Sequence, residues 1–236
     1  MRENVYNKQK ANRLGGISVR QGNFEEQQNH TQDVNHPSEK TAKTQKKAGL
    51  KDLLICLHDL VFPIGIGLVV LLLCFKIVVV SGTSMKNTLL DGDYLLLISS
   101  SFYHDPKYGD IIVASKDAYE DGVPIVKRII ATEGQTVDID FDEGVVYVDG
   151  TALNEPYVSS SMSYLGVDFP LVVDEGCLFI MGDNRFISED SRSPKIGLID
   201  RREVLGKAIF LFMPGTDKGK VARDFSRLGV LSNGTR

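Results

Sequence analysis

The sequence predicts a mainly β protein, in which an antiparallel β-sheet domain follows a single N-terminal transmembrane helix. The first observation is a long apolar run, residues 53–80, interrupted by charge or histidine only at His58, Asp59 and Lys76. The second is that the helical period disappears after Val80. Short β-branched runs separated by turn residues follow, a pattern typical of antiparallel β structure. With 236 residues and 42% hydrophobic content, the chain can bury one domain of medium size.

The N-terminal segment contains little that could pack. Met1 to Gly49 is mainly Asn, Gln, Lys, Ser and Gly, so we expect residues 1–52 to be a disordered tail, cytoplasmic if the next segment spans a membrane. The net charge of -4 and a pI near 5.6 argue against binding nucleic acid over the whole surface, and no nucleic-acid partner is expected. The tail ends in a basic cluster, Lys40, Lys43, Lys46, Lys47 and Lys51.

The apolar run predicts a transmembrane helix over residues 53–76. Leu60 to Phe75 carries no charge, and about 20 helical residues cross a bilayer core of ~30 Å. Lysines beside the inner end place the N-terminus in the cytoplasm and the domain after Lys76 outside. A buried core helix is disfavoured by the length and the flanking charge, and a cleavable signal peptide by the fifty-residue tail before it.

The segment from 77 to 214 is expected to form the β domain, with residues 215–236 as a loose tail. Val78 to Val80 is β-branched, so the anchor should pass almost at once into a first strand. Asp142-Glu143-Gly144 and Asp149-Gly150 predict tight turns. The remaining strand candidates are 94–98, 111–114, 125–130, 145–148, 178–181 and 204–212.

The residues of this domain exclude most routes to hydrolysis. Its only histidine is His104, in a polar loop, so a Ser-His-Asp triad would depend on that one residue. One histidine and one cysteine leave only carboxylates as further zinc ligands, which argues against a zinc site, and no metal or cofactor is expected. Cys56 and Cys74 fall inside the apolar span, and Cys177 is expected to be a structural thiol. Lysine remains as a candidate base.

Lys127 has the surroundings that a lysine base requires. A lysine acts as a base only when it is neutral, and burial can lower its pKa from ~10.4 by up to ~3 to 5 units. Alternation in the strand places Lys127 on one face with Ile125 and Ile129, while Arg128 points the other way. Taken alone, Lys127 is better explained as an exposed residue of an edge strand, where positive charge discourages aggregation. Together with Ser84 and the anchor, it indicates a membrane-bound serine peptidase.

Four motifs in order carry a family resemblance, which runs from the anchor to about Phe212. They are Ser81-Gly82-Thr83-Ser84-Met85 with Thr88-Leu89; Gly109-Asp110-Ile111-Ile112-Val113; Lys127-Arg128-Ile129-Ile130 with Glu133-Gly134; and Gly182-Asp183-Asn184-Arg185 with Ser188 and Asp190-Ser191-Arg192. In this combination the chain resembles bacterial type I signal peptidase, the leader peptidase family, which uses a Ser-Lys dyad.

The resemblance implies roles for individual residues. Ser84 would be the nucleophile, Lys127 the general base, and Ser188 the serine that hydrogen-bonds and orients the lysine. The Ser84 amide would form part of the oxyanion hole, and Met85 would lie near the substrate groove. Gly82 stands where some relatives have a hydroxyl side chain. Asp183, Asp190 and Arg192 would shape the site from behind.

The resemblance also implies partners. The substrate would be the signal peptide of a secreted preprotein, with small residues at the first and third positions before the cut, bound by strand addition. The enzyme would be a monomer, single-pass in the bacterial cell membrane and in contact with the lipid bilayer. Asn87 departs from the pattern because proline usually precedes Thr88-Leu89, and Glu133-Gly134-Gln135 replaces Pro-Gly-Asp. Asn87 is expected either to loosen the turn that holds Met85 near the substrate groove or to mark a specialised member of the family.

Two other interpretations stay open from the sequence. Self-cleaving repressors of the SOS response share a Ser-Lys dyad and a related β fold, but the membrane span and the absence of a helix-turn-helix pattern argue against them. A membrane-anchored β domain that acts as a non-catalytic assembly or binding factor is the alternative from another class. Such a protein would not need Ser84, Lys127 and Ser188 together.

Overall fold

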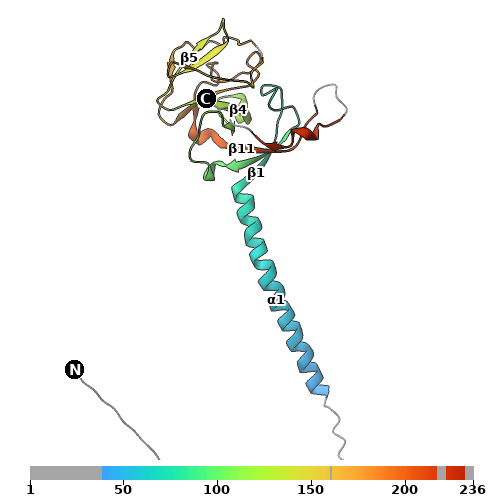
Figure 1. Ribbon diagram of the computed structural model, residues 1–236. Coiled ribbons are helices and arrows are strands. Elements are labelled where there is room, and N and C mark those ends of the chain that lie inside the picture. Colours follow the sequence, from blue (N-terminus) through green and yellow to red (C-terminus); the bar gives the residue numbers. More distant parts are fainter. Residues whose placement is uncertain (1–38, 160, 217–221, 232–236) are drawn as a thin grey trace, which may run out of the picture. The chain divides into compact units, whose positions relative to one another are not determined.

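The computed structural model describes residues 39–159, 161–216 and 222–231 (Figure 1). Its one α-helix, α1, spans Glu39–Cys74 and therefore begins well before the predicted Leu53. The expectation of disorder is wrong for residues 39–52, because Glu, Lys, Ala and Gln are strong helix formers and extending an existing helix needs no new nucleus. Residues 1–38 of the predicted tail lie outside the described residues.

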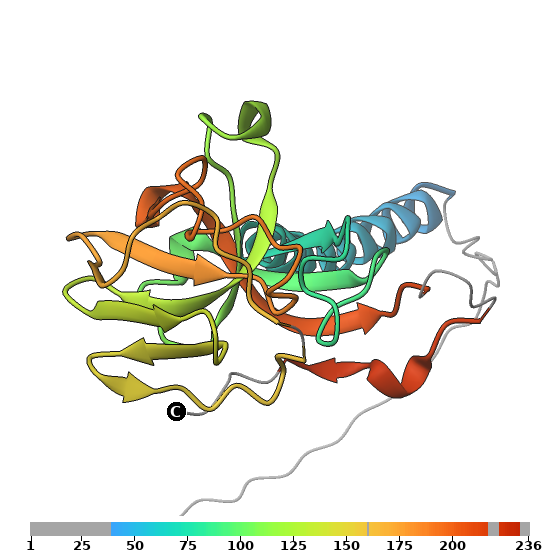
Figure 2. The ribbon, with the colours of Figure 1, turned by 90° about the horizontal axis from the view of Figure 1, so that it is seen from above.

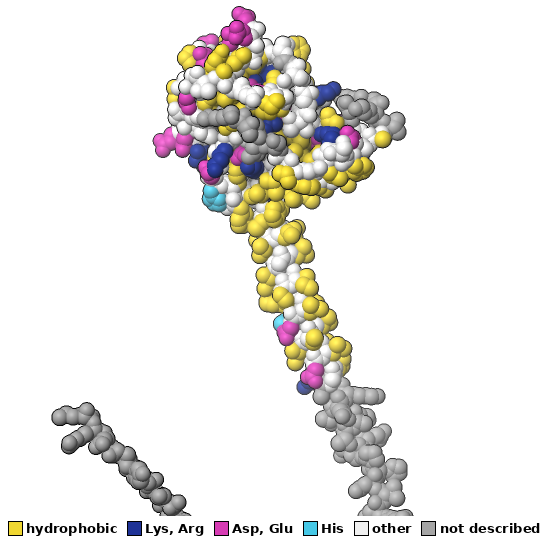
Figure 3. Space-filling model, viewed as in Figure 1, with side chains coloured by type: hydrophobic (Ala, Val, Ile, Leu, Met, Phe, Trp, Pro, Cys, Tyr) yellow, Lys and Arg dark blue, Asp and Glu magenta, His cyan; other side chains and the backbone are white. Residues whose placement is uncertain are grey.

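The stretch Gly49–Cys74 of α1 is long and apolar enough to cross a membrane. Its 26 residues extend about 39 Å as a helix, which exceeds the ~30 Å of a bilayer core. Large apolar side chains such as Leu68 and Leu72 are exposed all around it, and Figure 3 shows them covering its surface. A helix that is apolar on every side requires an apolar environment.

The helix passes directly into β1, Phe75–Val79, as the β-branched residues predicted. All strand pairs are antiparallel, which confirms the predicted fold class. The main sheet has the order β1-β2-β11-β3-β4-β9-β10, and β12 lies alongside β11 (Figure 2). Its other strands are β2 Tyr94–Ser99, β3 Ile111–Ala114, β4 Ile125–Thr132, β9 Cys177–Met181, β10 Ile199–Asp200, β11 Val204–Met213 and β12 Gly229–Val230.

A second sheet of four short strands, in the order β7-β6-β5-β8, is inserted between β4 and β9. It consists of β5 Thr136–Asp140, β6 Val145–Val148, β7 Thr151–Ala152 and β8 Leu171–Val172. Asp149 and Gly150 both have positive φ, so the predicted turn joins β6 to β7 as a two-residue hairpin loop. Four 3-10 helices complete the domain: η1 Ser100–Phe102, η2 Glu120–Gly122, η3 Arg201–Glu203 and η4 Phe225–Arg227.

Separate apolar clusters support the two sheets. Val137, Val146 and Phe179 belong to the cluster that joins the second sheet to β4 and β9. Met85 and Leu89 are fully buried in another cluster, against the residues of β2 and β11. The segment that follows Ser84 is thereby fixed by core packing, although Ser84 itself lies in an irregular turn.

The C-terminal segment corrects the prediction of a loose tail over 215–236. The Arg227 guanidinium forms an ion pair with the buried carboxylate of Asp93, with 2.7 Å between Nη2 and Oδ2. A buried carboxylate needs such a counter-charge, and no local pattern in the sequence shows where it comes from. Together with the pairing of β12 to β11, this ion pair attaches residues 222–231 to the sheet. Residues 217–221 and 232–236 lie outside the described residues.

Candidate functional site

Ser84 and Lys127 meet in the folded domain. Ser84 lies in the turn after β1 and Lys127 in β4, and Nζ of Lys127 is 2.8 Å from Oγ of Ser84, which is hydrogen-bonding distance. Lys127 is 4% exposed and Ser84 is half-buried. A hydroxyl and an amine therefore stand in contact, with the amine enclosed by protein and the hydroxyl reachable from outside, an arrangement that suits a nucleophile and its base.

Burial lowers the pKa of Lys127 to about 8. The carboxylates of Asp190 and Asp183 act in the opposite direction, and the Arg192 guanidinium adds to the lowering. With this pKa roughly one molecule in ten holds a neutral amine at pH 7. The lysine can therefore accept a proton near neutral pH, as the sequence predicted for a buried lysine.

Ser188 lies beside the Ser84–Lys127 pair, but it does not form the hydrogen bond to Lys127 that the resemblance implies. Its Oγ is buried and has no hydrogen-bond partner among the described residues. Gly182 is packed against it: a Cβ at this glycine would stand 2.2 Å from Oγ of Ser188 and 2.5 Å from the carbonyl oxygen of Ser84. The absence of a side chain at Gly182 lets the two serine segments meet.

Backbone contacts hold the nucleophile turn. The Asn184 amide donates to the carbonyl oxygen of Ser84 at 2.9 Å, and its side chain donates to that of Thr83 at 3.2 Å. The Gly82 amide donates to Oδ1 of Asp91 at 2.8 Å. Gly82 has a φ of +96°, a conformation that favours glycine. The departure noted at Gly82 therefore has a local structural reason.

A buried ion pair joins Arg128 to Asp183. Arg128 Nε and Nη2 lie 2.9 Å and 2.7 Å from the two carboxylate oxygens, and Nη1 donates to the carbonyl of Gly109. The hydroxyl of Thr88 also donates to Asp183. The sequence placed Asp183 behind the site but assigned no role to Arg128. An arginine among the apolar residues of a central strand needs a buried partner, and this pattern could have indicated a role for Arg128.

Asp190 and Arg192 form a second buried ion pair, with 2.8 Å between Nε and Oδ1. Oδ2 of Asp190 accepts from the Gly182 amide at 2.9 Å, and Arg192 donates to the carbonyl oxygens of Arg185 and Ser188. Through these contacts, the buried side chains of Asp190 and Arg192 hold the backbone of the loop from Gly182 to Arg192. The supporting role that the resemblance implies for both residues stays a prediction.

The described structure contradicts one expectation for the nucleophile turn, the loosening at Asn87, and leaves another as a prediction. Met85 is 1% exposed and packs into the core, so it anchors the turn, and its place near the substrate groove stays a prediction. Asn87 has a φ of +93°, which a proline ring excludes. Its side chain donates to Oγ of Ser159 at 2.6 Å and to the carbonyl of Tyr157 at 3.3 Å. The turn is therefore tied to a neighbouring segment instead of loosened.

Other candidate features lie away from the dyad. His104 is exposed in the loop after η1. Within the part of the chain that the structure describes, no group of three or more His, Cys, Asp or Glu side chains is placed to hold a metal ion. A cavity of about 460 Å³ lies between the β5–β6 turn and the segment from Leu153 to Met162. Neither Ser84 nor Lys127 lines this cavity.

Comparisons with known proteins indicate the family of the chain. The family model described as signal peptidase, peptidase S26, matches residues 54–213. A signal peptidase I of Bacillus licheniformis is 37% identical over 164 residues, which cover 66% of this chain and 86% of that protein. Signal peptidase I T of Bacillus subtilis (strain 168) is 33% identical over 193 residues, 78% of this chain and 95% of that protein. A solved signal peptidase I of Enterococcus faecalis V583 is 32% identical, with a TM-score of 0.36, and the match covers 44% of this chain and 97% of that chain.

Proposed function

Because the chain belongs to the signal peptidase family, peptidase S26, we propose that it is a membrane-bound serine endopeptidase in which Ser84 is the nucleophile and Lys127 the general base. It removes signal peptides from exported preproteins and cuts after small residues. The observation that carries this proposal is the contact of 2.8 Å between Lys127 Nζ and Ser84 Oγ, made by a buried lysine whose pKa is lowered to about 8.

The reaction follows from this geometry. Neutral Lys127 takes the proton of Ser84 while Oγ attacks the scissile carbonyl carbon, and it passes that proton to the leaving amine as the C–N bond breaks. The signal peptide is then held as an ester on Ser84. Lys127 next removes a proton from a water that attacks this ester and returns that proton to Ser84 Oγ as the ester bond breaks, so the signal peptide leaves as a carboxylic acid that ionises.

The developing oxyanion needs a donor, and the Ser84 amide is suited to this role. Among the described residues this N–H makes no hydrogen bond of its own. One preorganised donor of this kind typically contributes ~3 kcal/mol to transition-state stabilisation. Gly82 has no hydroxyl to add a second donor.

An open strand edge next to Lys127 supports peptide binding by strand addition. Ile125 to Lys127 pair with β3 on one side, whereas the pairing of β4 with β9 begins only at Arg128. Since alternate residues of an antiparallel strand bond to opposite neighbours, the Val126 amide and carbonyl face the side where β9 is absent. An extended peptide bound there would be read through its backbone, beside the base.

The apolar helix determines where the enzyme is located in the cell. Gly49–Cys74 anchors the enzyme as a single span in the bacterial cell membrane. Lys51 and the preceding lysines place the N-terminus in the cytoplasm, and the β domain of residues 77–214 acts on the extracytoplasmic face as a monomer. The partners are the signal peptide and the bilayer.

The test is cleavage of a preprotein with a small-x-small site by the detergent-solubilised protein, with the new N-terminus mapped by mass spectrometry. Ser84→Ala and Lys127→Ala should abolish cleavage at that site, whereas Ser81→Ala, on the exposed side of the same turn, should retain it. Equal cleavage by all variants would assign the activity elsewhere. No cleavage by any folded variant would favour the non-catalytic binding factor.

A further inference from the structure

One segment of the second-sheet region, Glu155 to Ser159, contacts all three catalytic segments. Each contact is made by a residue close to a proposed catalytic one. Asn87 lies three positions after Ser84, Arg128 directly follows Lys127, and Arg185 lies three positions before Ser188. We call residues 155–159 the clamp segment.

The first contact holds the nucleophile turn. Asn87 Nδ2 donates to Oγ of Ser159 at 2.6 Å and to the carbonyl oxygen of Tyr157 at 3.3 Å. Its φ of +93° is uncommon for a residue with a side chain, and asparagine tolerates such conformations better than most. The two hydrogen bonds stabilise that conformation three residues from the nucleophile.

The second contact holds the lysine strand. The guanidinium carbon of Arg128 lies 3.9 Å from the centre of the Tyr157 ring, so the cation stacks on the aromatic face. Burial raises the pKa of Tyr157, which therefore stays a phenol at neutral pH. Its hydroxyl donates to Glu155 at 2.8 Å and lies 3.3 Å from the hydroxyl of Tyr108. The ring is thus fixed at both its face and its tip.

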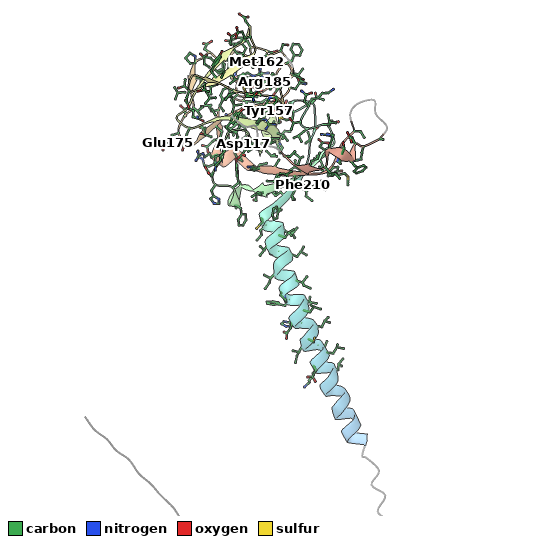
Figure 4. All side chains as sticks on the ribbon, in the orientation of Figure 1. Asp117, Tyr157, Met162, Glu175, Arg185 and Phe210 are labelled. Atoms are coloured by element: carbon green, nitrogen blue, oxygen red, sulfur yellow. The ribbon has the colours of Figure 1, made fainter. Side chains whose placement is uncertain are left out.

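The third contact holds the loop that carries Ser188. The two ends of the Arg185 guanidinium donate to the two carboxylate oxygens of Glu155, one at 2.8 Å, and Nε donates to the carbonyl oxygen of Gly182. Arg185 is fully buried, and the side chain of Glu155 is 8% exposed. Figure 4 shows Tyr157 and Arg185 close together in the interior of the β domain.

From this convergence we propose that the clamp segment positions the Ser84–Lys127 dyad, with Tyr157 as its central positioning residue; this rests on the function proposed above. Other links join the catalytic segments in pairs, as Asn184 joins Ser84 and Asp183 joins Arg128. The clamp segment touches all three at once. Because Ser84 lies in an irregular turn and Lys127 lies at the start of β4, where the strand is paired with β3 but not with β9, a common support fixes their separation.

Tyr157→Ala tests the clamp against Tyr157→Phe and Tyr164→Ala. Tyr157→Ala should lower kcat at least tenfold with KM changed less than about threefold, because positioning acts on the chemical step more than on binding. Tyr157→Phe retains the ring on Arg128 and should keep most of the activity. Tyr164 is exposed and contacts Phe141 and Asp168, so Tyr164→Ala should behave as wild type. Wild-type kcat in a folded Tyr157→Ala protein would overturn the proposal.

A second readout separates failure of the clamp from failure of the proposed function. The Lys127 side chain is titrated by NMR, with Lys127→Arg to assign its signal. Loss of the clamp in Tyr157→Ala should admit water around Lys127 and raise the pKa of this lysine. The shift can be measured even in a protein that cleaves nothing. An unchanged titration together with unchanged kcat would exclude a positioning role.

If Tyr157→Ala does not fold, the exposed end of the clamp still provides a test. Asn87→Ala and Ser159→Ala remove the two ends of one hydrogen bond at exposed positions. Each should lower kcat, and the double variant should lose no more than the stronger single one, since both remove the same interaction. Independent, multiplicative losses, or no loss in either variant, would contradict the clamp.

Discussion

A lysine has to lose its proton before it can act as a base, and the burial of Lys127 makes that loss easier while it destabilises the fold. Lys127 is 4% exposed, and burial lowers its pKa to about 8 from an ordinary value of 10.5. Between those two pH values the unfolded chain binds more protons than the folded one at this site. The unfavourable contribution of Lys127 is therefore complete below about pH 8 and disappears as the pH rises towards 10.5.

The pH dependence of the reaction follows from the same shift. Only the neutral amine can take the proton of Ser84, so kcat/KM should rise with pH and level off above about pH 8. Initial rates on a neutral peptide substrate in wild type would measure this profile. A rate that stays flat through that range would mean that Lys127 is not the group whose ionisation controls catalysis.

Replacement of Lys127 should abolish activity and raise the free energy of unfolding. Lys127→Met should be inactive, yet it should unfold at a higher urea concentration and gain about 3 kcal/mol at pH 7, because the burial of an ionisable amine is removed. The gain should shrink as the pH rises towards 10.5. Lys195→Met, at a largely exposed lysine, is the control and should change little at any pH. A gain independent of pH would point to packing alone.

Gly182 should tolerate no side chain. In Gly182→Ala the new Cβ would come within 2.5 Å of the backbone carbonyl oxygen of Ser84, which cannot rotate away as the Ser188 hydroxyl can. The nucleophile turn must then shift, and a displacement of ~1 Å can cost about 100-fold in rate. Kinetics of this variant beside Gly65→Ala, in α1, where nothing lies within 4 Å of the added atom, would measure the effect. Because both positions require a check of folding, far-UV circular dichroism accompanies the assay.

At the scale of elements, local sequence patterns predicted most of the longer strands but did not predict the residues that hold the site in place. The six predicted strands after residue 80 are all present, because each is a β-branched or apolar run bounded by turn residues. The strand β5 was missed although its polar and apolar residues alternate, because Asp138 and Asp140 are of a residue type disfavoured in strands. Arg128 and Tyr157 were missed for another reason. Their importance depends on partners distant in the sequence, which no local pattern reveals.

The attachment of the C-terminal segment can be measured through one ion pair. Arg227→Ala would leave the buried carboxylate of Asp93 without its counter-charge and should lower the free energy of unfolding by ~2 to 3 kcal/mol. In Arg202→Ala the lost pair with Asp200 is at an exposed arginine, so the free energy of unfolding should change much less. Urea unfolding of both variants gives the comparison. Equal, small changes would mean that residues 222–231 contribute little to the fold.

At the scale of the whole molecule, charge is unevenly distributed along the β domain. Residues 129–184, which include the whole second sheet, contain eleven carboxylates and no lysine, arginine or histidine. Arg128, Arg185 and Arg201 neutralise three of them from outside this range. Figure 3 shows acidic side chains gathered at the end of the domain where Figure 1 labels β5. Four carboxylates of this end have no lysine or arginine within ion-pair distance in the described structure: Asp138, Asp140, Asp142 and Glu143.

The negative charge at this end of the domain should attract positively charged substrates before they contact the protein. A substrate with lysines after the cleavage site should associate faster than the same substrate with glutamates there, and the difference in kcat/KM should fall between about 50 mM and about 500 mM salt, since the Debye length shortens several-fold. Asp142→Asn with Glu143→Gln should reduce the difference. Asp117→Asn with Glu120→Gln, outside the acidic range, removes the same formal charge and should reduce it less. A preference that survives high salt would have to come from direct contacts in a pocket, because screening removes steering but leaves close, partly buried contacts largely intact.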